Sequence, residues 1–188
     1  MSTIDLETGL LRTARQVPSP NGDDRPSGTV ADLIVVHGIS LPPGEFGGPW
    51  IDLLFTNRLP PEGHPYFATI ADRKVSSHLL IRRDGEVVQY VPFHRRAWHA
   101  GVSSYEGREK CNDFSIGIEL EGTDDMAYEP IQYRVLSSVI RQLLDTYAQL
   151  STRRIAGHSD IAPGRKTDPG PFFDWPRLQA LLRCDPGK

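Results

Sequence analysis

Residues 114–122, "FSIGIELEG", alternate strictly between apolar side chains and small or acidic ones. A period of two is the pattern of a β-strand, so the chain must build at least one sheet. One face of this strand is predicted to be core and carries Phe114, Ile116, Ile118 and Leu120. On the other face Gly117 leaves room for a ligand beside Glu119, although spacing alone favours a solvent-facing carboxylate.

Two further patterns predict more of the sheet. The apolar run in "ADLIVVHGIS" (residues 31–40) indicates a buried strand with His37 at its carboxyl end. Residues 78–92, "HLLIRRDGEVVQYVP", are typical of a hairpin, because Asp84-Gly85 accepts the positive φ of a tight turn.

Apolar residues recur at helical spacing between Pro130 and Tyr147, behind a proline suited to a first helical turn. The stripe expected to face the core comprises Ile131, Val135, Val139, Ile140, Leu143, Leu144 and Tyr147. A second helix is predicted in "FDWPRLQALLR", with Asp174 as its N-cap and Pro176 in its first turn. Since strands and helices interleave, we expect an α/β or α+β domain with a central mixed β-sheet.

A Pro/Gly-rich excursion spans residues 39–75, with a short helix predicted in "GPWIDLLF". Connections of this length are uncommon unless they serve as lids or binding loops. We therefore expect the excursion to form one wall of a functional groove.

The length and charge of the chain exclude several classes of protein. Its 188 residues suit one domain. A net charge of -3, with basic and acidic residues interspersed, indicates no basic surface for binding nucleic acid. The longest apolar runs fall far short of the roughly 20 residues that span a membrane. The acidic N-terminus does not resemble an export signal, so a cytoplasmic location is expected. Cys111 and Cys184 form no CxxC pair and are expected to be reduced.

Residues 158–170, "HSDIAPGRKTDPG", contain several candidate catalytic and metal-binding side chains within thirteen positions. Their prolines and glycines predict a loop rather than a helix, following a helix and a short connection. His158 could face the same cleft edge as His37, and two histidines with one carboxylate and an open position are what a catalytic zinc requires. Spacing does not choose between Asp160 and Asp168 as that carboxylate, and Lys166 alone would be a surface charge.

Five blocks of sequence, in this order, resemble the AmpD-type 1,6-anhydro-N-acetylmuramyl-L-alanine amidases: "LIVVHGISLPPGEFGGPWI", "HLLIRRDGEVVQYVPF", "AWHAGVS", "CNDFSIGIELEGTD" and "GHSDIAPGRKTDPG". The similarity covers roughly residues 10–180. It implies the fold of the peptidoglycan recognition proteins, a central mixed β-sheet flanked by helices with zinc in a groove. Residues 1–188 are accordingly expected to form a single zinc amidase domain.

The resemblance implies a role for each candidate residue. One zinc ion per chain would be bound by His37, His158 and Asp168, with Asp160 a neighbouring structural carboxylate. Glu119 would handle the proton of the attacking water, and Lys166 would stabilise the developing oxyanion. The implied substrate is a small muropeptide, cleaved between the anhydro-N-acetylmuramyl lactyl group and L-alanine. No nucleic acid, membrane or obligate protein partner is expected.

Four residues are expected to bind the substrate: Tyr66, Lys74, Trp98 and Lys110. The two lysines stand where the family often has arginine. A lysine ammonium is a point charge, whereas an arginine guanidinium can donate two parallel hydrogen bonds to one carboxylate. Gly38 stands where asparagine is common, which removes one polar contact. Two alternatives are a non-catalytic peptidoglycan-binding module, which the complete ligand set disfavours, and an amidase acting on intact cell wall, which the missing export signal disfavours.

Overall fold

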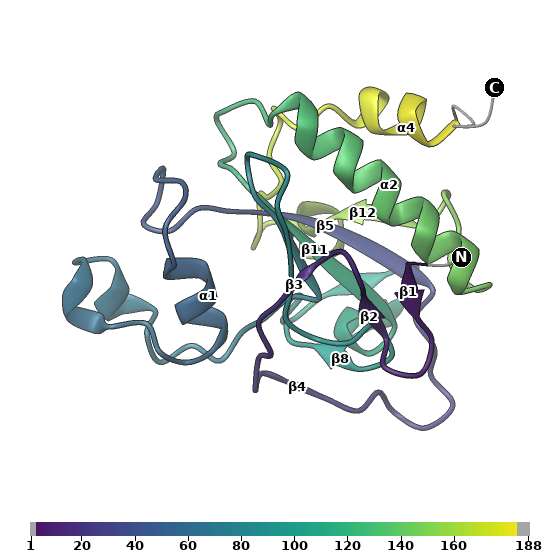
Figure 1. Ribbon diagram of the computed structural model, residues 1–188, viewed down its shortest axis with the longest axis horizontal. Coiled ribbons are helices and arrows are strands. Elements are labelled where there is room, and N and C mark those ends of the chain that lie inside the picture. The colour runs from purple at the N-terminus through teal and green to yellow at the C-terminus, as the bar shows by residue number, and fades with distance from the viewer. Residues whose placement is uncertain (1–2, 184–188) are drawn as a thin grey trace.

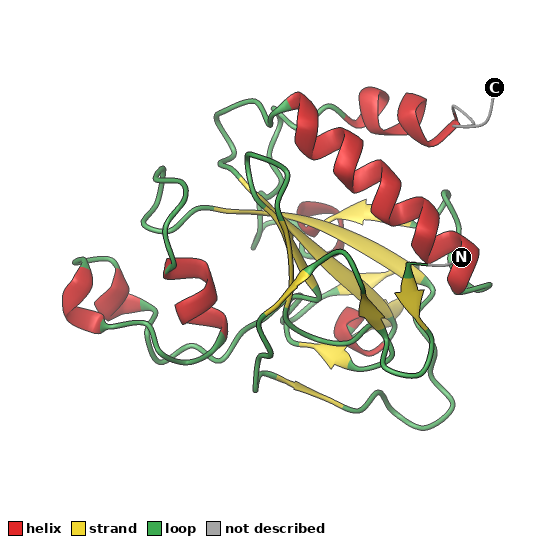
Figure 2. Ribbon diagram, viewed as in Figure 1, coloured by secondary structure: helices red, strands yellow, loops and turns green. Residues whose placement is uncertain are grey.

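The computed structural model describes residues 3–183 and is built around a six-stranded mixed sheet (Figure 1; Figure 2). The strands in spatial order are β12 (Ile155–Gly157), β5 (Leu33–Ile39), β11 (Ser115–Glu121), β6 (Leu79–Ile81), β7 (Val87–Gln89) and β3 (Arg15–Gln16). Three two-stranded pairs accompany it: β1 (Ile4–Asp5) with β2 (Leu10–Leu11), β4 (Gly22–Asp23) with β8 (Arg96–Ala97), and β9 (Ser104–Tyr105) with β10 (Arg108–Glu109). The predicted central mixed sheet is confirmed.

The middle of the sheet is parallel. β12, β5, β11 and β6 run in one direction, and Glu119 of β11 is the register partner of His37 of β5. β6 and β7 form the predicted antiparallel hairpin, whose turn contains Gly85 at a φ of 92°. Because parallel strands end at the same edge of a sheet, the carboxyl ends of β5, β11 and β12 lie together.

Two helices cover one face of the sheet, α2 (Pro130–Thr146) and α4 (Trp175–Arg183) (Figure 1). α2 begins at the predicted proline and ends one residue before the predicted end. At the start of α4 the Arg177 N–H donates to Asp174 Oδ1 at 2.9 Å, as expected of the predicted cap. The core-facing stripe of α2 differs in part from the prediction: Tyr133 and Leu136 also face the core, whereas Ile131 is half-buried and is not part of that cluster.

β11 is buried on both faces, which corrects part of the strand prediction. Ile116, Ile118 and Leu120 pack in the core shared with α2, as predicted. Phe114 precedes the strand and packs instead in the cluster on the opposite face, with Leu33 and Val35. The acidic face is not open to solvent, since Glu119 is 8% exposed.

The segment that carries His158 is more regular than predicted. β12 precedes it directly, and residues His158–Ile161 form a single helical turn, α3. The prolines at positions 163 and 169 follow this turn and do not interrupt it. His158 is therefore held between a strand and a helical turn rather than on an open loop.

The excursion contains the predicted short helix, α1 (Trp50–Phe55), and two single turns of 3-10 helix, η1 (Pro61–Gly63) and η2 (Phe67–Thr69). A third such turn, η3 (Cys111–Asp113), precedes β11. In Figure 1 the excursion extends from the sheet away from α2. Phe55 and Phe67 are buried with Leu80 and Val88 of the hairpin, so the excursion has its own apolar contact with the sheet.

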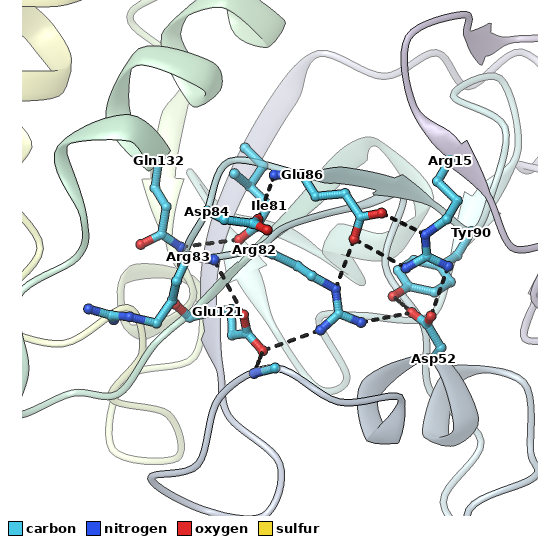
Figure 3. Close-up of polar contacts among 11 residues, drawn as sticks. Arg15, Asp52, Ile81, Arg82, Arg83, Asp84, Glu86, Tyr90, Glu121 and Gln132 are labelled. Atoms are coloured by element: carbon cyan, nitrogen blue, oxygen red, sulfur yellow. Dashed lines mark hydrogen bonds and ion pairs between the residues drawn. The ribbon is translucent and has the colours of Figure 1, made fainter.

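A network of charged side chains centred on the buried Arg82 also anchors the excursion (Figure 3). The Arg82 guanidinium lies 3.6 Å from Asp52 of α1, 3.2 Å from Glu86 and 3.4 Å from Glu121. The Glu121 carboxylate also accepts the N–H of Gly47 at 2.7 Å. One arginine thus connects α1, the hairpin and the end of β11.

We expect Arg82→Gln to lower the free energy of unfolding by about 3 kcal/mol, because it removes the arginine paired with the buried Glu121 carboxylate, whereas Asp52 and Glu86 keep their contacts with Arg15. The measurement is chemical denaturation. Arg12→Gln is the matched control, since Arg12 and its partner Asp5 are far more exposed and their pair contributes little. Equal effects of the two substitutions would contradict a stabilising role for Arg82.

Two sequence predictions concern location and thiol chemistry. None of the helices within residues 3–183 combines the length and apolar character needed to cross a bilayer. Cys111 is a buried free thiol, as predicted. Cys184 lies outside the described residues.

Candidate metal centre and active-site cleft

Three parallel strands deliver the candidate site residues to one edge of the sheet. His37 lies near the end of β5, and Glu119 lies opposite it on β11. His158 follows the last residue of β12, which pairs with β5 on its other side. Ligands of such sheets usually bind outside the carboxyl ends of the strands.

The two histidines and Asp168 converge on one point. His37 Nδ1 lies 2.9 Å from His158 Nδ1 and 3.3 Å from Asp168 Oδ2, and His158 Nδ1 lies 3.0 Å from the same oxygen. Ligand atoms about 2.0 to 2.1 Å from a tetrahedral zinc lie about 3.3 Å from one another. The triangle therefore has the size of one face of a zinc tetrahedron.

The protonation of these groups suits a cation. Burial lowers the pKa of His37 to about 4, so its imidazole is neutral near pH 7. Although burial raises it, the neighbouring imidazoles of His158 and His37 hold the pKa of Asp168 well below its usual range. His158 Nε2 lies 3.2 Å from the Ala100 carbonyl oxygen, which can only accept, so Nε2 is the nitrogen that donates there and Nδ1 is the nitrogen that faces the triangle. This donor set fits a divalent metal.

Asp160 has a different partner from Asp168. Its Oδ2 accepts the N–H of Gly157 at 2.7 Å, which closes the turn at the start of α3. The group of side chains able to hold a metal within the described chain consists of His37, His158 and Asp168. The geometry thus favours Asp168 over Asp160.

Glu119 and Lys166 both line the cleft beside this triangle. Glu119 Oε2 is buried and has no hydrogen-bond partner among the described residues. Burial raises the pKa of Glu119 well above its usual range, Asp168 adds to the rise, and Lys166 opposes it. A carboxyl in this environment can accept a proton and release it again.

The cleft has a volume of about 920 Å³ and is bounded on one side by the excursion. Tyr66, which is 40% exposed, lines it together with Arg73. The other three expected substrate contacts lie outside this lining. Trp98 is half-buried and donates its indole N–H to Asp23 at 3.2 Å, while the Lys74 and Lys110 side chains are exposed.

Two glycines flagged in the sequence make room for side chains of the protein itself. A Cβ on Gly117 would lie 2.4 Å from the His99 ring, so the space expected for a ligand is filled by His99. A Cβ on Gly38 would lie 2.2 Å from the Tyr128 hydroxyl, which donates to the Pro169 carbonyl oxygen at 2.9 Å. Sequence reasoning missed both His99 and Tyr128, and the glycines opposite them were the available signal.

A family model described as N-acetylmuramoyl-L-alanine amidase matches residues 27–171. The chain is 63% identical to the 1,6-anhydro-N-acetylmuramyl-L-alanine amidase AmpD of Escherichia coli (strain K12) over 177 residues, covering 94% of this chain and 96% of that protein. A crystal structure of a Se-Met AmpD derivative aligns with a TM-score of 0.92 at 62% identity, covering 95% of this chain and 99% of that one. The complex of the Escherichia coli amidase AmiD with the substrate anhydro-N-acetylmuramic acid-L-Ala-D-gamma-Glu-L-Lys aligns with a TM-score of 0.59 at 28% identity, covering 84% of this chain and 60% of that one.

Proposed function

The chain belongs to the N-acetylmuramoyl-L-alanine amidase family, and from that premise we propose that it hydrolyses the amide between the lactyl group of 1,6-anhydro-N-acetylmuramic acid and the L-alanine of a stem peptide. The AmpD-type resemblance predicted from the motifs is confirmed, as is the enzyme class. The observation that carries the proposal is the convergence of His37, His158 and Asp168 beside Glu119 in one cleft.

The metal we propose is zinc, one ion per chain, held by His37 Nδ1, His158 Nδ1 and Asp168 Oδ2. Neutral imidazoles with one carboxylate suit zinc, and three protein ligands leave a position for the reaction. When bound, zinc polarises the scissile carbonyl and lowers the pKa of water to about 7.

In this proposal Glu119 transfers the proton and Lys166 stabilises the negative charge. Glu119 accepts a proton from the water that attacks the lactyl carbonyl carbon. The carbon–nitrogen bond then breaks, and the same carboxyl delivers the proton to the departing alanine nitrogen. The Lys166 ammonium stabilises the negative charge that develops on the carbonyl oxygen. The products are the anhydro sugar acid and the free peptide.

The excursion and the size of the cleft support a small, soluble substrate. The AmiD complex holds an anhydro-muropeptide in a related fold, and a cleft of about 920 Å³ can bury a ligand of that class. We place Tyr66 among the substrate contacts and keep Lys74, Trp98 and Lys110 as candidates, since a bound peptide could extend beyond the cleft. We also propose that the enzyme acts in the cytoplasm as a single domain and without an obligate protein partner, as its resemblance to recycling amidases implies.

We expect kcat/KM to be at least about 10-fold higher for the anhydro-muropeptide than for its reducing-sugar counterpart. The bicyclic anhydro ring is rigid and lacks the free reducing-end hydroxyl, and a difference of about 1.4 kcal/mol in transition-state binding gives this ratio. Parallel steady-state assays of the zinc-loaded protein, with and without chelator, measure both the preference and the metal requirement. Equal kcat/KM values, or efficient release of peptide from purified sacculi, would favour an amidase of intact wall.

A further inference from the structure

The ring nitrogen of His37 that faces away from the metal triangle contacts a third histidine. His37 Nε2 lies 2.9 Å from His99 Nδ1, and the two rings meet edge to face at 88° with centroids 5.0 Å apart. His99 is 9% exposed and does not belong to the ligand triangle. Its ring lines the same cleft, and its hydrogen bond to the triangle is made to His37.

The far side of His99 fixes the direction of this hydrogen bond. The Ser115 hydroxyl donates to the Cys111 carbonyl oxygen at 2.5 Å, and a carbonyl can only accept. Ser115 Oγ must then accept from His99 Nε2, which lies 3.1 Å away. A neutral His99 with its proton on Nε2 has a lone pair on Nδ1 and accepts the N–H of His37.

The tautomer of His37 matters because a competing acceptor lies beside its other nitrogen. Asp168 Oδ2 is 3.3 Å from His37 Nδ1 and, together with His158 Nδ1 at 2.9 Å, would draw the proton of a neutral imidazole to that atom. A proton on Nδ1 would block the atom that points into the triangle. An acceptor at Nε2 opposes this and keeps Nδ1 free.

We propose that His99 is a positioning residue that holds His37 in the Nε2–H tautomer and so presents Nδ1 as a metal ligand. The inference rests on the proposed function for the identity of the metal, but the hydrogen-bond chain through Ser115 to Cys111 stands independently of catalysis.

The segment that carries His99 is built to hold this position. Asn112 Oδ1 accepts the backbone N–H groups of both His99 and Ala100, at 3.0 and 2.8 Å. The Ala100 carbonyl oxygen in turn lies 3.2 Å from His158 Nε2. Two consecutive residues therefore orient both histidine ligands, and Gly117 leaves space for the His99 ring against β11.

The test compares His99→Leu with His99→Asn, which have similar size but differ in the acceptor near the Nδ1 position. Zinc affinity is measured by chelator competition on the folded protein. We expect His99→Leu to weaken zinc binding by at least about 10-fold, and His99→Asn by no more than about threefold, as for other groups that orient a metal ligand. His78→Asn is the control for loss of a neighbouring buried histidine: its ring packs edge to face against His99 with centroids 5.9 Å apart, but its hydrogen bonds go to Gly117 and Arg95 and not to His37, so the variant should keep the wild-type affinity.

A second measurement reads the tautomer directly. In zinc-free wild type, ¹⁵N chemical shifts of His37 should report a proton on Nε2, and in His99→Leu they should report a shift of that proton to Nδ1. If His99→Leu does not fold, Ser115→Ala is measured instead, and it should populate both tautomers.

Wild-type affinity in His99→Leu, or an unchanged tautomer in the folded variants, would overturn the role of His99. If wild type binds zinc without amidase activity, the proposed function fails, and the affinity comparison still tests the role of His99. If wild type binds no zinc, the ¹⁵N measurement of the His37 tautomer alone tests the role of His99.

Discussion

His158→Ala is expected to lose stoichiometric zinc and amidase activity together. The substitution removes one of three ligand atoms and leaves a site with only His37 and Asp168 facing each other. Metal stabilisation of the transition state is worth several kcal/mol, so kcat/KM should fall by at least about 1,000-fold. Elemental analysis of the purified variant and steady-state kinetics on the anhydro-muropeptide measure the two losses.

Asp160→Asn is the control for this prediction. Asp160 lies two residues from His158 in α3, but its carboxylate oxygen accepts the Gly157 N–H instead of joining the triangle, and an amide oxygen can accept as well. The variant should therefore retain zinc. Stoichiometric zinc in His158→Ala would refute the ligand assignment. Equal zinc loss in Asp160→Asn and Asp168→Asn would undermine the choice between the two aspartates.

Glu119→Gln is expected to keep zinc bound while kcat falls by at least about 100-fold, the usual cost of losing general acid–base help. The amide has nearly the size of the carboxylate but cannot take up and return a proton. Glu119 Oε2 has no hydrogen-bond partner among residues 3–183, so the substitution breaks no structural contact at that atom. Zinc content, thermal unfolding and kcat should be measured on the same preparation.

Glu109→Gln provides the comparison, because Glu109 is an exposed carboxylate on β10 outside the cleft. Its kcat should equal that of the wild type. A Glu119→Gln variant that carries zinc and turns over at the wild-type rate would remove Glu119 from the mechanism. A variant that loses zinc would instead indicate that Glu119 supports the metal site.

Much of the fold could be predicted because its hydrophobic patterns are local. The alternation around Ile116, the apolar run before His37 and the helical stripe after Pro130 each match one period over enough residues to identify the element. The hairpin was identified by one dipeptide whose glycine has the required positive φ. These features depend on neighbours in the sequence, and the structure confirms them.

The parts that could not be predicted depend on distant partners. β12 has three residues, and its position is set by pairing with β5 rather than by its own pattern. The preference for Asp168 over Asp160 rests on a side-chain contact across a turn that spacing does not describe. His99 resembles an ordinary buried histidine in the sequence, and only its contact with His37 distinguishes it. The low exposure of Glu119 likewise was not predicted from its strand, and the charged groups that act on it, Asp168 and Lys166, are distant in sequence.

The strand order of the sheet has a consequence for the biosynthesis of the protein. β5 is made early but is flanked by β11 and β12, and Ile155 of β12 pairs with Ile34 of β5, more than half of the chain away. Contacts this distant in sequence form slowly, because the intervening chain must be closed first. A ribosome-bound chain that stops before residue 155 lacks both β12 and two of the three proposed metal ligands, His158 and Asp168. If these residues bind the metal as proposed, the site is complete only after residue 168 has been made, and a truncated product would carry the cleft wall without a competent centre.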